Sequence, residues 1–489
     1  MSERIWIGVD LGTQSVRVLA VDDAGRVLGR GSRPLTGTRN GERHEQDPDQ
    51  WWTAFSAAAR EATVGLDPAR IGGLAVDATS GTILLADDTG RPLTPGLMYD
   101  DARASEQAKR VNEIGEALWQ RLGYQRMQAG WALPKLAWLN EHHSTEDVRL
   151  LHQPDLITWR LAGRQVASDA SHALKTGYDL LADRWPEDVF DRLGIPTAML
   201  PDVVRPGTVI GTVCAASAAT TGIPAGTPIV AGMTDGCAAQ LGGGALGRGS
   251  WNAVLGTTLV LKGVADHLVR DPGGVVYCHR GPNETWLPGG ASSSGAGALT
   301  RRWPGADLEA LTARAAQRPL GPVVYPLAGE RGERFPFVAP DLTPFSLGRI
   351  EDDIDAFHGV LTGLACVERL CFDYLDHLGA PTDGTLAFTG GGGANGYWTR
   401  LRADLLGREV QLPKHAESAI GMAILAASHT RKSLVDTAST MVRIDAVIEP
   451  DALRHNELTE LYLRFVDHLH DRGRLTQPFT AHVHRRAEH

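Results

Sequence analysis

Two short turns in this chain pair a flexible backbone with a hydroxyl group, a combination that can hold a phosphate. The first follows an apolar run that ends in Asp10, and it contains Gly12 and Thr13. The second, Gly256-Thr257-Thr258, lies 244 residues later between two further apolar runs. Glycine lets an anion approach the backbone closely, and exposed turn amides with a hydroxyl can cradle a phosphate. Either turn alone also fits an ordinary hairpin, but two at matching positions favour a shared polyphosphate.

Asp235 is the candidate general base. It follows the apolar run 228–231, is flanked by Thr234 and Gly236, and opens a predicted helix. A carboxylate that a strand end presents in this way can take a proton from a substrate hydroxyl. The alternative is a helix N-cap, a role in which aspartate is common.

A glycine cluster near residue 390 is the third candidate for chemistry. Gly391, Gly393 and Gly396 satisfy the G-x-G-x-x-G pattern between a predicted strand and a predicted helix, so a dinucleotide site must be considered. A dinucleotide site requires an acidic residue at the end of the next strand to bind the ribose, whereas here the acidic residue, Glu409, begins that strand. A flat nucleobase could instead lie on the bare backbone of the glycine run that includes Gly391 and Gly392. Asn395 and Trp398 follow this run at the start of the predicted helix. The chain has no P-loop motif and no protein-kinase motif set.

Composition narrows the class of protein. The 489 residues include 43% hydrophobic and 22% charged residues, as is normal for a globular chain of two large domains or about three smaller ones. The net charge of −10, without a basic stripe, argues against nucleic acid as a partner. No apolar run is long enough for a membrane span or a signal peptide. Five scattered cysteines suit a reducing compartment, so we expect a cytoplasmic protein.

Other chemistries fit poorly. The histidine pairs at 142–143, 468/470 and 482/484 lack the spacing of zinc ligands. Ser293 lacks the leading glycine of a nucleophile elbow, which argues against a serine hydrolase.

The elements that must position these residues form a repeat. Strand, Gly-Thr turn and strand open the chain (residues 6–21) and recur at 250–264. The repeat predicts two similar halves, each beginning with a β-hairpin, joined by the Gly-, Pro- and Ala-rich stretch 205–231. A helix start is predicted at Asp47-Pro48, and a long amphipathic helix at 352–378.

These pieces, in this order, resemble the FGGY carbohydrate kinase family, within the actin, sugar kinase and Hsp70 superfamily. The resemblance covers about residues 4 to 430. The segments that carry it are GVDLGTQSVRV, EQDPDQWW, LMYDDARA, LPKLAWL, DLITWRLAG, SDASHALKTGYDL, AGMTDGCAAQLGGGAL, NAVLGTTLVL, GERFPF, TGGGGANGYWTRLRADLLGREV and ESAIGMAILAA.

The resemblance implies an α/β fold of two actin-like (ribonuclease H-like) domains, each a mixed β-sheet flanked by helices, with a cleft between them. We expect an N-terminal domain over residues 1–230 on the sugar and phosphate side. A C-terminal domain on the adenosine side would cover 231–475, and a flexible tail 476–489. The implied substrates are a small sugar and ATP with Mg²⁺, with no nucleic acid or membrane as partner. A homodimer is left open.

Site residues are implied by the same matches. Asp235 is the base, and Asp10 lies near Mg²⁺. The nucleotide is implied to contact Thr13, Gly256, Thr257, Gly391, Gly392, Asn395 and Trp398. Ser80, Asp101 and Arg103 are implied to contact the sugar, together with Asp235.

The substrate segment departs from one branch of the family. Xylulokinases usually show Gln-Met-His-Gly where this chain has Thr79-Ser80-Gly81-Thr82. This run, with MYDDAR and LPGGASSSG, resembles the D-ribulokinase-like branch, so we expect D-ribulose as the sugar. The alternatives are a xylulokinase or another FGGY kinase of L-ribulose, gluconate or glycerol. An NAD-dependent oxidoreductase fits less well, because the acid lies at the wrong end of the strand and the Gly-Thr turns count against it. A chaperone-like ATPase fits less well, because no peptide-binding β-domain is expected after the second half.

Overall fold

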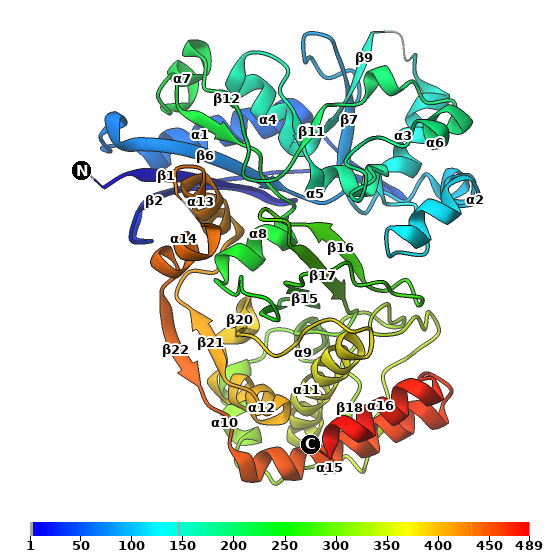
Figure 1. The fold of residues 1–489 in the computed structure, drawn as a ribbon. Helices are drawn as coiled ribbons and strands as arrows, with labels where there is room; N and C mark the ends of the chain where they lie inside the picture. Colours follow the sequence, from blue (N-terminus) through cyan, green and yellow to red (C-terminus); the bar gives the residue numbers. More distant parts are fainter. Residues whose placement is uncertain (1–2, 145–146, 432, 489) are drawn as a thin grey trace. The chain divides into compact units, whose positions relative to one another are not determined.

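The computed structural model describes residues 3–144, 147–431 and 433–488. The chain divides into two compact units (Figure 1). The first unit comprises residues 1–244, 279–287 and 415–443, and the second comprises 245–278, 288–414 and 444–489. This differs from the predicted boundary at residue 230. The first unit extends through helix α8 (Asp235–Gly242) and takes back helix α13 (Ser418–Ser428), because α13 packs on α8 and strand β1 (Ile5–Leu11).

The sheet of the first unit has the strand order β12-β13-β6-β1-β2-β3. Besides β1, its strands are β2 (Ser15–Asp22), β3 (Val27–Pro34), β6 (Ile71–Ala78), β12 (Val209–Thr212) and β13 (Pro228–Val230). β1, β6 and β13 run parallel to one another, whereas β1, β2 and β3 form an antiparallel meander.

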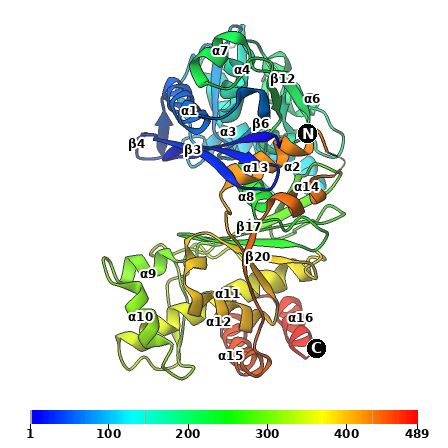
Figure 2. The same ribbon diagram turned by 90° about the vertical axis from the view of Figure 1, so that its left-hand side faces the viewer.

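Two helices cover opposite faces of this sheet (Figures 1 and 2). Helix α1 (Pro48–Thr63) packs on β2 and β3, and its N-cap is Asp47, as predicted. Helix α13 packs on the other face so closely that a Cβ on Gly8 would lie 1.7 Å from the Ala419 carbonyl oxygen. A glycine is therefore required at this strand position.

The seven-stranded sheet, most of which belongs to the second unit, repeats this strand order and adds one strand, β16, at an edge. Its order is β16-β17-β15-β14-β20-β21-β22, in which β14 and β15 form the predicted antiparallel hairpin and β20 is parallel to β14. The outer strand β22 is antiparallel to β21, as β12 is to β13. The bounds of these strands are Trp251–Leu255 (β14), Leu259–Gly263 (β15), Tyr277–Arg280 (β16), Trp286–Ala291 (β17), Leu386–Thr389 (β20), Val410–Pro413 (β21) and Ile444–Ile448 (β22). The predicted two similar halves are thus confirmed at the level of strand order.

A smaller sheet of the first unit lies next in sequence to the segments that are predicted to contact the sugar. Its order is β4-β5-β8-β7-β9. The strands are Thr38–Asn40 (β4), Arg43–Gln46 (β5), Ile83–Asp87 (β7), Gly96–Leu97 (β8) and Val148–His152 (β9). Three helices lie in the same part of the sequence: α2 (Ser105–Arg121), α3 (Ala132–His142) and α4 (Gln153–Ala162).

Helices dominate the rest of the second unit. The predicted long helix is α11 (Asp353–His377), buried along most of its length, and its Phe372 meets Trp251 of β14 edge to face. The C-terminal residues differ from the prediction of a flexible tail. Gln477–Ala487 forms helix α16, because Phe479 and Val483 give it an apolar face that is buried against α11 and helix α15 (Ala452–Asp471).

Candidate active site

Three carboxylates of the first unit stand at neighbouring strand ends. Asp10 near the end of β1 is the register partner of Asp77 near the end of β6. An isolated bridge pairs Ala78 with Thr234, the residue before Asp235. The carboxyl ends of parallel strands form one edge of a sheet, where ligands of open α/β sheets bind. Asp10, Asp77 and Asp235 therefore meet at the edge where a ligand is expected.

The charges in this cluster repel one another. Burial, together with the negative charges of Asp235 and Glu417, raises the pKa of Asp10 to about 6, although Arg17 opposes the shift. Burial and the charges of Asp10 and Asp235 hold the pKa of Asp77 well above its ordinary value. Neither side-chain oxygen of Asp77 accepts a regular hydrogen bond from the described residues. Buried carboxylates without compensating donors are costly, so the site favours a cation.

A hard divalent cation such as Mg²⁺ fits this donor set. Mg²⁺ prefers oxygen ligands and is usually held by one or two carboxylates together with water and substrate phosphates. Among the described residues, no group of three or more His, Cys, Asp or Glu side chains forms a ready metal cage. The chain itself would thus supply only part of the coordination sphere. Asp10 is the more accessible of the two carboxylates on β1 and β6, so it is the one that would face the cation.

Asp235 begins helix α8 and is half-buried. The backbone N–H of Gly236 donates to Asp235 Oδ1 over 2.7 Å. The side chain is not the N-cap, since that position belongs to Thr234. The N-cap alternative is therefore wrong, and the role of Asp235 as a general base stays a prediction.

The first Gly-Thr turn connects β1 to β2. The N–H of Gly12 donates to the Ser15 carbonyl over 3.1 Å, and Gln46 Nε2 donates to the Thr13 carbonyl over 2.7 Å. Gln46 is itself fixed, because its Oε1 accepts from the buried indole of Trp51. The turn is thus held from behind, while Thr13 remains half-buried.

The second Gly-Thr turn connects β14 to β15 in the second unit. The N–H of Gly256 donates to the Thr258 carbonyl, and the carbonyls of Gly256 and Thr257 accept from Ala296 and Gly297. The Thr257 side chain is exposed. Where the first sheet pairs Asp10 with Asp77, the second pairs Val254 with Thr389, so this turn carries no repelling carboxylates.

A cavity of about 530 Å³ in the second unit contains the predicted nucleobase residues. Its walls come from helices α9 (Gly297–Arg302), α10 (Leu308–Ala315) and α12 (Gly396–Leu406) and from the glycine turn before α12. A Cβ on Gly391 would meet nothing within 4 Å, so its backbone faces open space. Gly392 differs, because a Cβ there would clash with the Leu255 side chain.

Asn395 and Trp398 shape this cavity from behind. Asn395 Oδ1 caps α12 by accepting from the Trp398 N–H, and its Nδ2 donates to Thr312 Oγ1 over 2.8 Å. Trp398 is only 2% exposed, and its indole N–H donates to the Leu361 carbonyl. The indole therefore serves as a wall of the cavity rather than as an open stacking surface. Tyr397, whose hydroxyl lies 2.8 Å from His358 Nε2, is more accessible.

The loop after β6 presents Ser80. Gly81 turns the backbone with a positive φ of 103°, which glycine adopts without strain. Thr79 Oγ1 donates to Gln153 Oε1 over 2.7 Å, and Lys175 Nζ donates to the Ser80 carbonyl over 3.2 Å. The loop backbone is thus clamped, while the Ser80 hydroxyl is buried and has no hydrogen-bond partner among the described residues. A hydroxyl in this state is ready for a polar ligand.

Asp101 and Arg103 are already paired with each other. Asp101 Oδ2 accepts from Arg103 Nη2 over 2.7 Å and from the His44 N–H over 2.7 Å. Arg103 also donates to Glu45 and lies over the Trp138 ring. Since Asp101 is fully buried, this ion pair holds the loop after β8 in place. The resemblance implies that Asp101 and Arg103 contact the sugar, and this role stays a prediction. Ser80 is better placed for such a contact, because its hydroxyl has no hydrogen-bond partner among the described residues.

Several residues of the site were missed from the sequence. Asp77 ends a buried apolar strand just as Asp10 does, and this shared pattern could have identified it. Lys135 is fully buried and donates to the carbonyls of Leu97 and Met98, behind the Asp101 loop. Burial lowers the pKa of Lys135 to about 7. Nothing in the local sequence distinguishes Lys135 or Lys175 from surface lysines.

Known proteins are similar to this chain over most of its length. Models of the FGGY family of carbohydrate kinases match residues 5–242 (N-terminal domain) and 234–430 (C-terminal domain). A xylulose kinase of Streptomyces rubiginosus is 32% identical over 86% of this chain and 87% of its own length. A second, of Streptomyces coelicolor, is 31% identical over 93% and 94%.

A solved structure extends the similarity to the fold. The xylulose kinase of Rhodospirillum rubrum superposes with a TM-score of 0.86 at 26% identity, covering 96% of this chain and 99% of the other. The family models cover both of the units that carry the two similar sheets. The chain belongs to the FGGY family of carbohydrate kinases.

Proposed function

We propose that this chain is an ATP-dependent kinase that phosphorylates a hydroxyl group of a ketopentose. The observation that carries the proposal is the placement of Asp235 beside the buried Asp10–Asp77 pair in a chain of this family. Phosphoryl transfer needs little covalent chemistry from the protein. It needs positioned substrates, neutralised charge and one base that accepts the hydroxyl proton.

Asp235 is the base in this mechanism. Its half-buried carboxylate accepts the proton of the sugar hydroxyl as that oxygen attacks the γ-phosphorus of ATP, and the bond between this phosphorus and the leaving ADP breaks. The Gly236 N–H donates to Oδ1 of this carboxylate and so holds it at the start of α8. Ser80 lies two residues beyond the Ala78–Thr234 bridge and donates to, or accepts from, a sugar hydroxyl.

ATP is bound by glycine backbone and threonine hydroxyls. The cavity lined by Gly391, Gly392 and Asn395 has room for an adenosine. Backbone amides and hydroxyls at Thr13, Gly256 and Thr257 suit phosphate oxygens. Mg²⁺ bound near Asp10 would neutralise charge on the phosphates and on the carboxylate cluster.

Xylulose is the first candidate for the sugar. The similar proteins reported above are xylulose kinases, and one of them is 32% identical to this chain. The comparisons do not confirm D-ribulose, which the residues of the Ser80 loop predict. D-ribulose stays a second candidate because the unpartnered Ser80 hydroxyl occupies the place of the Gln-Met-His-Gly run of xylulokinases.

The proposal is tested by ADP release measured with D-xylulose, D-ribulose, L-ribulose, glycerol and gluconate as acceptors. The kcat/KM for one ketopentose should exceed those for glycerol and gluconate by at least about tenfold, since a site that pairs each hydroxyl penalises a wrong one by 1–3 kcal/mol. Equal or higher activity with glycerol or gluconate would contradict the assignment to ketopentoses.

A further inference from the structure

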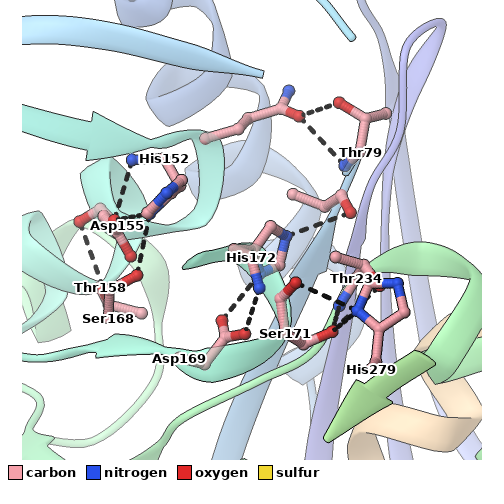
Figure 3. A network of polar contacts seen from close by, with 12 residues as sticks. Thr79, His152, Asp155, Thr158, Ser168, Asp169, Ser171, His172, Thr234 and His279 are labelled. Atoms are coloured by element: carbon pink, nitrogen blue, oxygen red, sulfur yellow. Dashed lines mark hydrogen bonds and ion pairs between the residues drawn. The ribbon is translucent and has the colours of Figure 1, made fainter. Parts of the chain in front are cut away.

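A four-residue helix, α5 (Ala170–Ala173), touches the backbone of both segments that carry the proposed chemistry (Figure 3). It begins after Asp169 and lies wholly in the first unit, buried from solvent. His172 points from this helix toward the end of β6, and Ser171 points toward Thr234 (Figure 3). Residues 169–173 themselves are not part of the site described above.

His172 reaches the last residue of β6. Its Nδ1 lies 2.7 Å from Asp169 Oδ2, and its Nε2 lies 3.3 Å from the Ala78 carbonyl oxygen. Both partners are acceptors, so the two contacts favour a ring that carries a proton on each nitrogen. Burial lowers the pKa of His172, but the charges of Asp169 and Asp155 and the hydrogen bond to Asp169 raise it overall. The His152 ring, 6.2 Å away, also faces it.

Ser171 reaches the residue before the base. The N–H of Thr234 donates to Ser171 Oγ over 3.2 Å, and Thr234 Oγ1 lies 3.1 Å from the same oxygen. His279 Nδ1, 3.0 Å from Ser171 Oγ, fixes the hydroxyl from the other side. Because Asp235 follows Thr234 directly, a shift of this N–H moves the carboxylate.

The two contacts converge on one pair of residues. Ala78 and Thr234 form the bridge that continues the β6–β13 pairing. We propose that His172 and Ser171 are positioning residues, which set the sugar-binding Ser80 and the base Asp235 at the correct separation through the backbones of Ala78 and Thr234. This inference rests on the proposed function, because it assigns a role in that reaction.

The two residues should affect different kinetic constants. Ser171→Ala frees the Thr234 N–H and should lower kcat about tenfold with the sugar KM changed less than about twofold, since misplaced catalytic groups cost rate. His172→Asn withdraws the donor from Ala78, next to the sugar loop. It should raise the sugar KM about fivefold or more, with a smaller loss of kcat and an unchanged KM for ATP.

Each variant has a matched control in the first unit. Ser217 is a buried serine whose hydroxyl donates to the Arg160 carbonyl over 2.5 Å, away from both segments, so Ser217→Ala removes an equivalent group. His152 is an equally buried histidine paired with Asp155, and its Nε2 contacts Thr176 instead of a site segment. His152→Asn should lower thermal stability as His172→Asn does, without the change in sugar KM.

Hydrogen exchange gives a readout that needs no activity. In Ser171→Ala, the Thr234 amide should exchange at least about tenfold faster than in wild type, whereas Ser217→Ala should leave it unchanged. The inference is supported if the Thr234 amide exchanges faster in Ser171→Ala but not in Ser217→Ala, and if Ser171→Ala lowers kcat while His172→Asn raises the sugar KM. Unchanged exchange, or equal kinetic losses in both controls, overturns it. Absence of any sugar kinase activity in wild type would instead refute the proposed function, and the exchange experiment would still decide whether Ser171 positions the Thr234 backbone.

Discussion

Asp10 and Asp77 are register partners on the parallel strands β1 and β6, and their carboxyl groups share one buried corner of the first unit. Arg17, whose Nη1 lies 3.4 Å from Asp10 Oδ2, offsets part of the negative charge of this pair. The arrangement costs stability and prepares the site for a cation. Function and stability are therefore expected to oppose each other here.

The first prediction concerns Asp10→Asn in metal-free protein. The folded-state pKa of Asp10 is raised to about 6, so the folded protein retains a proton that the unfolded chain loses near pH 4. Stability from this group therefore falls as the pH rises from 4 to 6, and the loss is complete above pH 6. Asp10→Asn should raise the free energy of unfolding by about 3 kcal/mol at pH 7.5, at about 1.4 kcal/mol per pKa unit, and by little at pH 4.

Denaturant unfolding of both proteins at the two pH values measures this difference. The same variant should lose most of its kinase activity, since it removes the carboxylate proposed to lie near Mg²⁺. A variant that is less stable than wild type at pH 7.5 would show that the Asp10 carboxylate is not destabilising.

The second prediction concerns Asp235→Ala. Loss of a positioned general base should lower kcat at least about 10²-fold, while the protein still binds ATP. Asp266, an exposed aspartate paired with Arg248, provides the control Asp266→Ala. Steady-state kinetics and calorimetric ATP titration decide the matter. More than a tenth of wild-type kcat in Asp235→Ala would rule out its role as base.

The third prediction tests the nucleoside cavity. Gly391 faces open space in the cavity wall, so Gly391→Leu places a side chain there without a clash in the protein itself. Overfilling a site costs about 1–3 kcal/mol, so the KM for ATP should rise about 5- to 150-fold with the sugar KM unchanged. Gly321→Leu, outside the cavity lining, is the control. An unaltered KM for ATP would show that the adenosine binds elsewhere.

The fourth prediction concerns Ser80. D-xylulose and D-ribulose differ in configuration at C3, so a residue that discriminates them must hydrogen-bond near that hydroxyl. Ser80→Ala should shift the ratio of their kcat/KM values at least about fivefold. Ser56 of α1 also has a buried hydroxyl without a partner among the described residues, so Ser56→Ala is a matched control. A ratio that stays constant in Ser80→Ala would exclude this serine as a specificity residue.

Much of the fold could be predicted because its signals are local or periodic. Each Gly-Thr turn lies between two apolar runs, and this pattern predicts the hairpins β1–β2 and β14–β15. Asp235 and the Gly391 cluster are candidates because each follows a predicted strand and lies among turn-forming glycines.

What the sequence did not reveal depends on tertiary contacts. Asp77 became a site residue only through its register with Asp10, which spans 67 positions of the chain. The sequence does not reveal that Trp398 lines the cavity with a buried ring whose N–H donates to the Leu361 carbonyl, and its contact with the nucleotide stays a prediction. The predicted flexible tail is helix α16, because Phe479 packs against the rings of Tyr374 and His377 on α11. The local sequence does not indicate this contact.

The most direct test of the central claim is the stoichiometry of ADP and phosphorylated sugar formed from ATP and D-xylulose or D-ribulose, with and without the sugar. The account predicts one sugar phosphate per ADP, negligible ADP release without sugar, and loss of both products in Asp235→Ala. Sugar-independent ADP release at a comparable rate, or ADP formed with free phosphate in place of sugar phosphate, would contradict it.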